Sequence, residues 1–132
     1  MNGPTLHKTA AACAQDLPEA QLEHPFGPDW EVFKVGGKVF MLMMTEVPGR
    51  PVVILKADPG EAHALREQYS HITPGYHMNK KHWITLENGE GVDKKLVSEL
   101  VTDSYRLVVA HLPKAERPVD PHTYGTGTRA AR

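Results

Sequence analysis

The chain has 132 residues, a length that fits one domain whose core lies between two packed layers. The formal net charge is −1 with neutral histidines, so the chain lacks the basic excess typical of dedicated DNA-binding domains. The single cysteine excludes an internal disulfide, and no apolar run approaches the roughly 18–20 residues that span a bilayer. The first residues also lack the apolar core of a signal peptide, so we expect a cytoplasmic protein.

The first predicted element is a helix over residues 5–17. Thr5 can cap it, and Pro18 ends it. The apolar residues at helical spacing are Leu6, Ala10, Cys13, Ala14 and Leu17. Residues 24–29 follow with two prolines and a glycine, a composition that predicts a turn.

Three strands are predicted next, at residues 30–35, 38–45 and 51–57. Gly36 and Gly37 separate the first two strands and indicate a two-residue hairpin turn. Residues 38–45 are apolar on both faces, which predicts a central strand covered on both sides by helices or by a partner.

A second helix is predicted to start at Asp58, which is a good capping residue and precedes a proline at the first helical position. Residues 73–75, Thr-Pro-Gly, end this helical region and turn the chain. Two short strands are expected to follow, near residues 76–77 and at residues 82–86.

The last helix is predicted from Asp93, its cap, to Pro113, which ends it. Its apolar stripe consists of Leu96, Val97, Leu100, Val101, Leu107, Val108 and Leu112. Residues 114–132 are rich in Pro, Gly, Thr and Arg, so we expect a domain over residues 1–113 and a disordered tail over 114–132.

The predicted order is α-β-β-β-α-β-β-α. Hairpins dominate this order, so the sheet should be mostly antiparallel, with the helices packed on one face. The fold class expected from the sequence is therefore a two-layer α+β domain.

Six short motifs agree in order and spacing with the MmcQ/YjbR family: His24–Gly27, Phe33–Phe40, Leu55–Pro59, Pro74–Trp83, Asp103–Tyr105 and Leu112–Lys114. The chain resembles this family over about residues 5–117. The resemblance implies a CyaY-like (frataxin-like) α+β fold, so the expected domain is YjbR-like. It also implies a DNA-binding protein with two hairpin "wings" and no defined enzymatic activity. The basic family positions are Lys34, Lys38, Lys56, Lys80 and Lys81.

Residues 76–83 combine aromatic, amide and cationic side chains, and no acid occurs between His71 and Leu86. Such a segment can stack on flat groups and contact phosphates. The candidate nucleic-acid contacts here are Tyr76, His77, Asn79, Lys80, Lys81, His82 and Trp83. The alternative is an ordinary hairpin turn with solvated lysines and Trp83 in the core.

Strand alternation makes the two interpretations distinguishable. In a strand over residues 82–86, Trp83 and Thr85 share one face, and His82, Ile84 and Leu86 share the other. A tryptophan on a face without helices would be a surface aromatic, whereas a buried Trp83 would favour the ordinary turn.

Lys34 and Lys38 flank the predicted Gly-Gly hairpin, and Lys56 lies near the end of a predicted strand. These lysines can form a second basic wing. The alternative is that they only keep strand ends from pairing with other sheets.

The sequence contains no motif of an enzyme. Cys13 lies on an apolar helix face, where cysteine acts as a small hydrophobe. His77 and His82 could approach across a hairpin, but no cysteine partner or paired histidines on a helix support a metal site. We therefore expect no catalytic residue, no metal and no cofactor.

The function expected from the sequence is that of a non-enzymatic DNA-binding protein, a monomer or weak homodimer, with double-stranded DNA as its partner. The alternative is a protein- or small-ligand-binding module without a nucleic-acid role. The near-zero net charge and the methionine-rich residues 41–44 favour this alternative.

Overall fold

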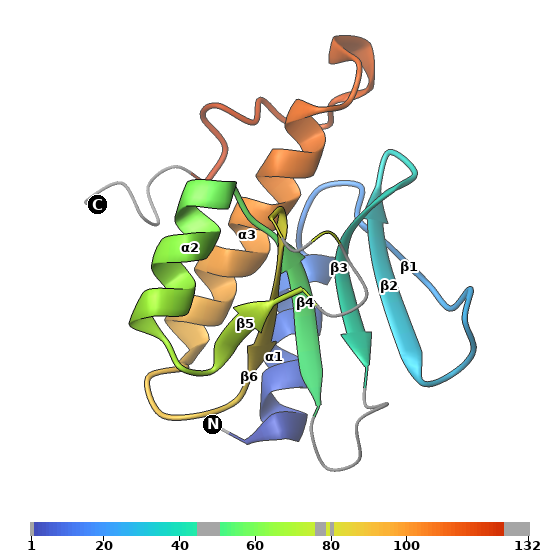
Figure 1. Cartoon of the computed structure of the whole chain (residues 1–132). Coiled ribbons are helices and arrows are strands. Elements are labelled where there is room, and N and C mark those ends of the chain that lie inside the picture. The colour runs from blue at the N-terminus through green and yellow to red at the C-terminus, as the bar shows by residue number, and fades with distance from the viewer. Residues whose placement is uncertain (1, 45–50, 76–78, 80, 126–132) are drawn as a thin grey trace.

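The computed structural model describes residues 2–44, 51–75, 79 and 81–125 (Figure 1). The helices and strands of this part of the chain are α1 (Gly3–Gln15), β1 (Gln21–Glu23), β2 (Trp30–Val35), β3 (Lys38–Met44), β4 (Val52–Lys56), α2 (Pro59–Gln68), β5 (Ile72–Pro74), β6 (Trp83–Glu87), α3 (Lys94–Ala110) and the 3-10 helix η1 (Lys114–Glu116). The strands form one sheet in the order β1-β2-β3-β4-β6-β5, with antiparallel pairing throughout. The predicted α+β class is confirmed.

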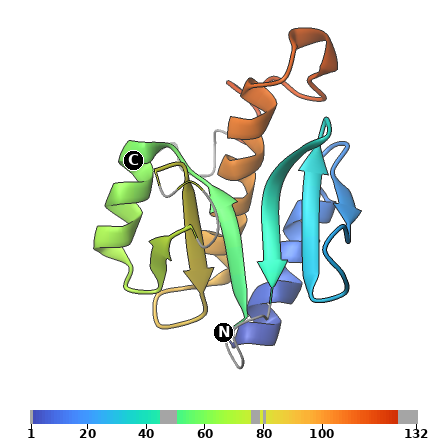
Figure 2. The same ribbon diagram turned by 45° about the vertical axis from the view of Figure 1, so that its right-hand side comes forward.

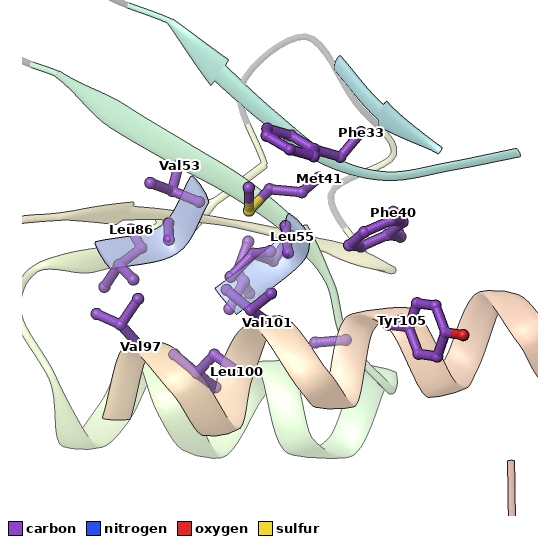
Figure 3. Packing of buried hydrophobic residues seen from close by; sticks show 14 of the residues in the cluster. Phe33, Phe40, Met41, Val53, Leu55, Leu86, Val97, Leu100, Val101 and Tyr105 are labelled. Atoms are coloured by element: carbon purple, nitrogen blue, oxygen red, sulfur yellow. The ribbon is translucent and has the colours of Figure 1, made fainter. Parts of the chain in front are cut away.

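The three α-helices lie on one face of the sheet (Figures 1 and 2). The larger apolar core lies between this face and the helices. Figure 3 shows side chains of the sheet, including Met41 and Leu55, directed toward Val97, Leu100 and Val101 of α3. The structure therefore has two layers, and no helix of the described residues covers the opposite face of the sheet.

The helix-free face of the sheet carries a second, smaller apolar cluster. Its buried members are Val32, Leu42, Met44, Val52 and Ile54. Trp30, Val39 and Trp83 are partly buried and pack against this cluster. Both faces of β3 are thus buried, as its two-sided apolar pattern predicts.

The N-terminal part differs from the prediction in two places. Helix α1 starts before Thr5, because the side-chain oxygen of Asn2 accepts the N–H of Thr5 at 2.8 Å and caps the helix. Between the predicted helix and the predicted turn, Gln21–Glu23 forms the edge strand β1 against β2. Three residues are too few to show strand alternation, so this element depends on its partner strand.

The strand that pairs with β6 is Ile72–Pro74, so Thr73 and Pro74, which were predicted to turn the chain, belong to a strand. Ile72 is buried in the core opposite Leu86. Pro74 is tolerated because β5 is an edge strand, where a missing backbone donor breaks no ladder. Residues 76–77 lie outside the described residues.

Residues 114–125, the described part of the expected tail, contact α3. The guanidinium of Arg117 donates to the carbonyl of Ala110 at 2.8 Å, at the C-terminal end of the helix. The ring of Tyr124 lies 5.9 Å from that of Tyr105, between ring centroids. This segment is held by hydrogen bonds and aromatic contact that its composition does not reveal.

Ser104 links α3 to two strands of the sheet. Its hydroxyl donates to the carbonyl of Phe40 in β3 and accepts the N–H of Lys56 in β4 at 2.8 Å. The β3–β4 register ends at the pair Met41–Leu55, so the serine hydroxyl bridges the strands just beyond that pair.

We expect Ser104→Ala to lower the free energy of unfolding by about 1–3 kcal/mol, since two backbone groups lose their buried partner. Urea denaturation measures this loss. The matched control is Ser98→Ala on the same helix, because the Ser98 hydroxyl contacts the sulfur of Cys13, at 3.1 Å in a partly buried position, and bridges no strands. Equal losses in the two variants would contradict the bridging role.

Candidate nucleic-acid interface

The β2–β3 hairpin places its two lysines on different faces of the sheet. Gly36 and Gly37 have φ of +57° and +80° and form the predicted two-residue turn. In the regular register next to this turn, Val35 pairs with Lys38 and Lys34 with Val39, and a β-bulge follows between Phe33 and Lys34. Cross-strand partners share a face and neighbours along a strand alternate, so Lys34 and Lys38 lie on opposite faces. The hairpin does not assemble the two lysines into one basic wing.

Lys34 is also paired with a carboxylate. Its ammonium lies 3.0 Å from a carboxylate oxygen of Glu23 in the neighbouring strand β1. The pair is partly solvent-exposed, and it reduces the positive potential that Lys34 offers to an anion. The sequence could not reveal this pair, because it depends on the unpredicted strand β1.

The turn before β6 presents a lysine and a histidine to solvent. Asn79, Lys81 and His82 are all exposed. The side-chain oxygen of Asn79 accepts the N–H of Lys81 at 2.9 Å, and its carbonyl accepts the N–H of His82 at 3.2 Å. Asn79 therefore shapes the turn, as the ordinary-turn interpretation predicts for this residue. The other predicted contacts of this segment lie outside the described residues: Tyr76, His77 and Lys80.

Trp83 is partly buried on the helix-free face, with its inner side against the second apolar cluster. The predicted alternation is confirmed for Trp83, Ile84 and Leu86, since Ile84 and Leu86 face the main core, whereas His82 lies in the turn before the strand. In β4 the residue opposite Trp83 is Lys56, which is itself partly buried. The indole is thus neither sealed in the core nor fully exposed.

Gly75 is the neighbour of Trp83 on the other side. Its N–H donates to the Trp83 carbonyl at 2.8 Å. A Cβ atom added at Gly75 would lie 2.5 Å from the Cβ of Trp83, closer than two such atoms can approach. The indole therefore has a lysine on one side and a residue without a side chain on the other.

Lys56 and Trp83 are cross-strand partners, and the turn that carries Asn79, Lys81 and His82 precedes β6 at the same end of the sheet (Figure 2), which defines a candidate surface. We call it the Trp83 surface, and it consists of Lys56, Asn79, Lys81, His82 and Trp83. The set contains two lysines and no acid. Aromatic, imidazole and ammonium groups in this arrangement suit a ligand that has flat rings and negative charge.

A separate cleft of about 390 Å³ lies where α2, α3 and the segment after η1 meet. Its lining residues are Asp58, Glu61, Asp103, Arg106, Leu107, Ala110, Pro121 and His122. Inside it, Arg106 lies 3.5 Å from Asp103 and donates to the carbonyl of Pro121 at 3.0 Å. The sequence does not predict this cleft, since Pro121 belongs to the expected tail.

Neither a metal cluster nor a membrane helix occurs in the part of the chain that the structure describes. Within it, no three histidine, cysteine or acidic residues lie close enough to hold a metal ion. The same residues include no helix with the length and apolarity needed to cross a bilayer.

The fold and the site together define a small two-layer α+β domain with a basic and aromatic surface at one end of a helix-free sheet face. The chain belongs to the YjbR family, whose family model matches residues 15–107. It is 45% identical over 117 residues to the uncharacterized protein YbdF of Escherichia coli O157:H7, covering 89% of this chain and 95% of that protein.

Two further proteins support this assignment. The uncharacterized protein YjbR of Escherichia coli strain K12 is 36% identical over 90 residues, 67% of this chain and 76% of that protein. The crystal structure of Deinococcus radiodurans protein DR2400 matches with a TM-score of 0.72 and 36% identity, covering 80% of each chain. These relatives establish the family and the fold, and their names state no activity.

Proposed function

We propose that this protein is a non-enzymatic DNA-binding protein that uses the Trp83 surface. Lys56 and Lys81 contact phosphates, and Trp83 contacts the flat face of a base or a sugar. The observation that carries the proposal is the position of Trp83, partly buried on a helix-free face, beside Lys56 and next to an exposed basic turn.

The charge balance favours modest affinity. The whole chain carries a net charge of −1, so long-range attraction to DNA is weak and the local lysines must supply the contact. Non-specific binding in the range of about 10⁻⁴–10⁻⁶ M at physiological salt is the expected scale. As part of the proposal, the protein acts in the cytoplasm as a monomer or weak homodimer.

Replacing Lys56 and Lys81 together with alanine is expected to lower the slope of log affinity against log salt concentration by about 1–2 units. Each lysine that neutralises a phosphate releases about one counterion, so the decrease in slope gives the number of phosphates that the variant no longer neutralises. Fluorescence anisotropy of a labelled DNA, titrated at several salt concentrations, measures the slope.

Lys94 and Lys95 provide the matched control. Both are exposed at the start of α3, in the helical layer, and their replacement by alanine removes the same total charge. The control variant should keep the wild-type slope. If both double variants lower the slope equally, only the net charge matters and the proposed surface is wrong.

The alternative function is a protein- or small-ligand-binding module. One observation favours it: Phe26 is 67% exposed, and its ring packs edge-on against Trp30 with centroids 5.8 Å apart. Exposed aromatic pairs are common at protein interfaces. Failure of the protein to bind any DNA at low salt would favour this alternative over the proposal.

A further inference from the structure

We infer that the nucleic acid bound at the Trp83 surface is single-stranded, in place of the duplex expected from the sequence. This inference rests on the proposed function. In a duplex the bases stack on one another and present only their edges in the grooves. An indole can stack only on a base that is unpaired or lies at a strand end, so a tryptophan contact selects single strands.

The residues beside Trp83 toward β5 have small side chains or none. Gly75 has no side chain, and the residue two positions along β6 on the same face is the small Thr85. Thr85 pairs with Thr73 of β5, another small residue, and its hydroxyl donates to the carbonyl of Pro74 at 3.0 Å. Toward β5 the sheet beside the indole is therefore built from small residues and Thr85 is buried, so the contact with a base is made by the partly exposed indole itself.

The two lysines lie where a strand backbone would pass. Lys56 is directly across from Trp83 in β4, and Lys81 precedes Trp83 by two residues. A base stacked on Trp83 thus has one cation on the β4 side and another at the turn. Proteins that bind single strands likewise combine aromatic side chains, which stack on bases, with a basic groove that contacts the backbone.

The structure gives less support to recognition of base edges in a duplex groove by the β2–β3 hairpin. Gly36 and Gly37 form the tip of the β2–β3 hairpin and have no side chains to contact base edges. Behind the tip, Lys34 is paired with Glu23. Lys38 lies on the face opposite Lys34, so the hairpin does not offer two cations to one duplex groove.

Tryptophan fluorescence tests the inference directly, because the chain has only two tryptophans, Trp30 and Trp83. In the variant Trp30→Phe, Trp83 is the sole indole. This variant is titrated at low salt with an oligothymidylate and with a blunt hairpin duplex of the same number of nucleotides. We expect the oligothymidylate to quench Trp83 and to bind about 5- to 150-fold more tightly than the duplex.

The variant Trp83→Leu removes stacking while retaining an apolar side chain against the second cluster. By anisotropy, its affinity for the oligothymidylate should fall about 5- to 150-fold, while its affinity for the duplex stays close to that of the wild type. The matched control is Trp30→Leu, on the same sheet face, which should retain tight binding of the single strand. Circular dichroism and urea denaturation of both variants verify that they fold.

The outcomes of these titrations separate the inference from the proposed function. Equal or tighter binding of the duplex, with unchanged Trp83 fluorescence, would overturn the single-strand inference and leave DNA binding intact. Equal decreases in affinity in the two leucine variants would also overturn it. Absence of binding to either nucleic acid at low salt would overturn the proposed function together with the inference.

Discussion

Replacing Tyr105 with alanine is expected to lower the free energy of unfolding by about 3–5 kcal/mol. Tyr105 is fully buried between α3 and the sheet, and its ring meets Phe40 in a T-shaped contact with centroids 5.4 Å apart (Figure 3). On its other side it contacts Tyr124. The truncation would leave a cavity that these neighbours cannot fill, and urea denaturation at 25 °C measures the loss.

The variant Tyr105→Phe separates the ring from the hydroxyl. The hydroxyl donates to the carbonyl of Pro18 at 2.6 Å and so ties the segment after α1 to α3. Removing it should cost about 1 kcal/mol, well below the alanine variant, because the ring contacts remain. A phenylalanine variant as unstable as the alanine variant would show that the hydroxyl, and not the packing, determines the stability.

The pH dependence of stability checks the hydroxyl independently. Burial raises the pKa of Tyr105 from 10.0 to about 12, with smaller contributions from Tyr124 and Glu19. Since the folded pKa lies above the unfolded one, the stabilisation by the neutral hydroxyl is complete below pH 10 and is lost as the pH rises toward 12. Between about pH 8 and pH 11, the wild type should lose about 1 kcal/mol more than Tyr105→Phe.

Elements with local signals were predictable from the sequence. Asp58 and Asp93 cap α2 and α3 as expected, because a capping side chain bonds to backbone only two or three residues away. Strand β1 was not predictable, because Gln21–Glu23 becomes a strand only by pairing with β2. The same limit applies to residues 114–125, whose contacts are with α3.

In the candidate site, too, features that depend on local geometry were predictable, and features that depend on distant contacts were not. Alternation correctly placed Trp83 on the face opposite Ile84, because it depends on backbone geometry alone. The opposite faces of Lys34 and Lys38 also follow from alternation, because the two-residue turn at Gly36 and Gly37 pairs Val35 with Lys38. The ion pair of Lys34 with Glu23 was not predictable, since it depends on strand β1. Partial burial of Trp83 likewise depends on side chains from β2, β3 and β4.

Replacing Gly36 with alanine is expected to lower the free energy of unfolding by about 2–5 kcal/mol. Its φ of +57° is a left-handed conformation that costs an alanine about 1–2 kcal/mol. An added Cβ would also lie 2.7 Å from a methyl carbon of Leu112, just beyond α3. Leu112 is buried and cannot move away freely, which adds about 1–3 kcal/mol of overpacking. Urea denaturation measures the total.

Gly37→Ala isolates the packing part of this loss. Gly37 also has a positive φ, of +80°, but an added Cβ there would have no atom within 4 Å. It should therefore show the backbone cost alone, about 1–2 kcal/mol. The difference between the two variants measures how firmly the hairpin tip rests on the end of α3. Equal losses would mean that the tip yields at little cost, and that the β2–β3 hairpin is not anchored to the helical layer through Leu112.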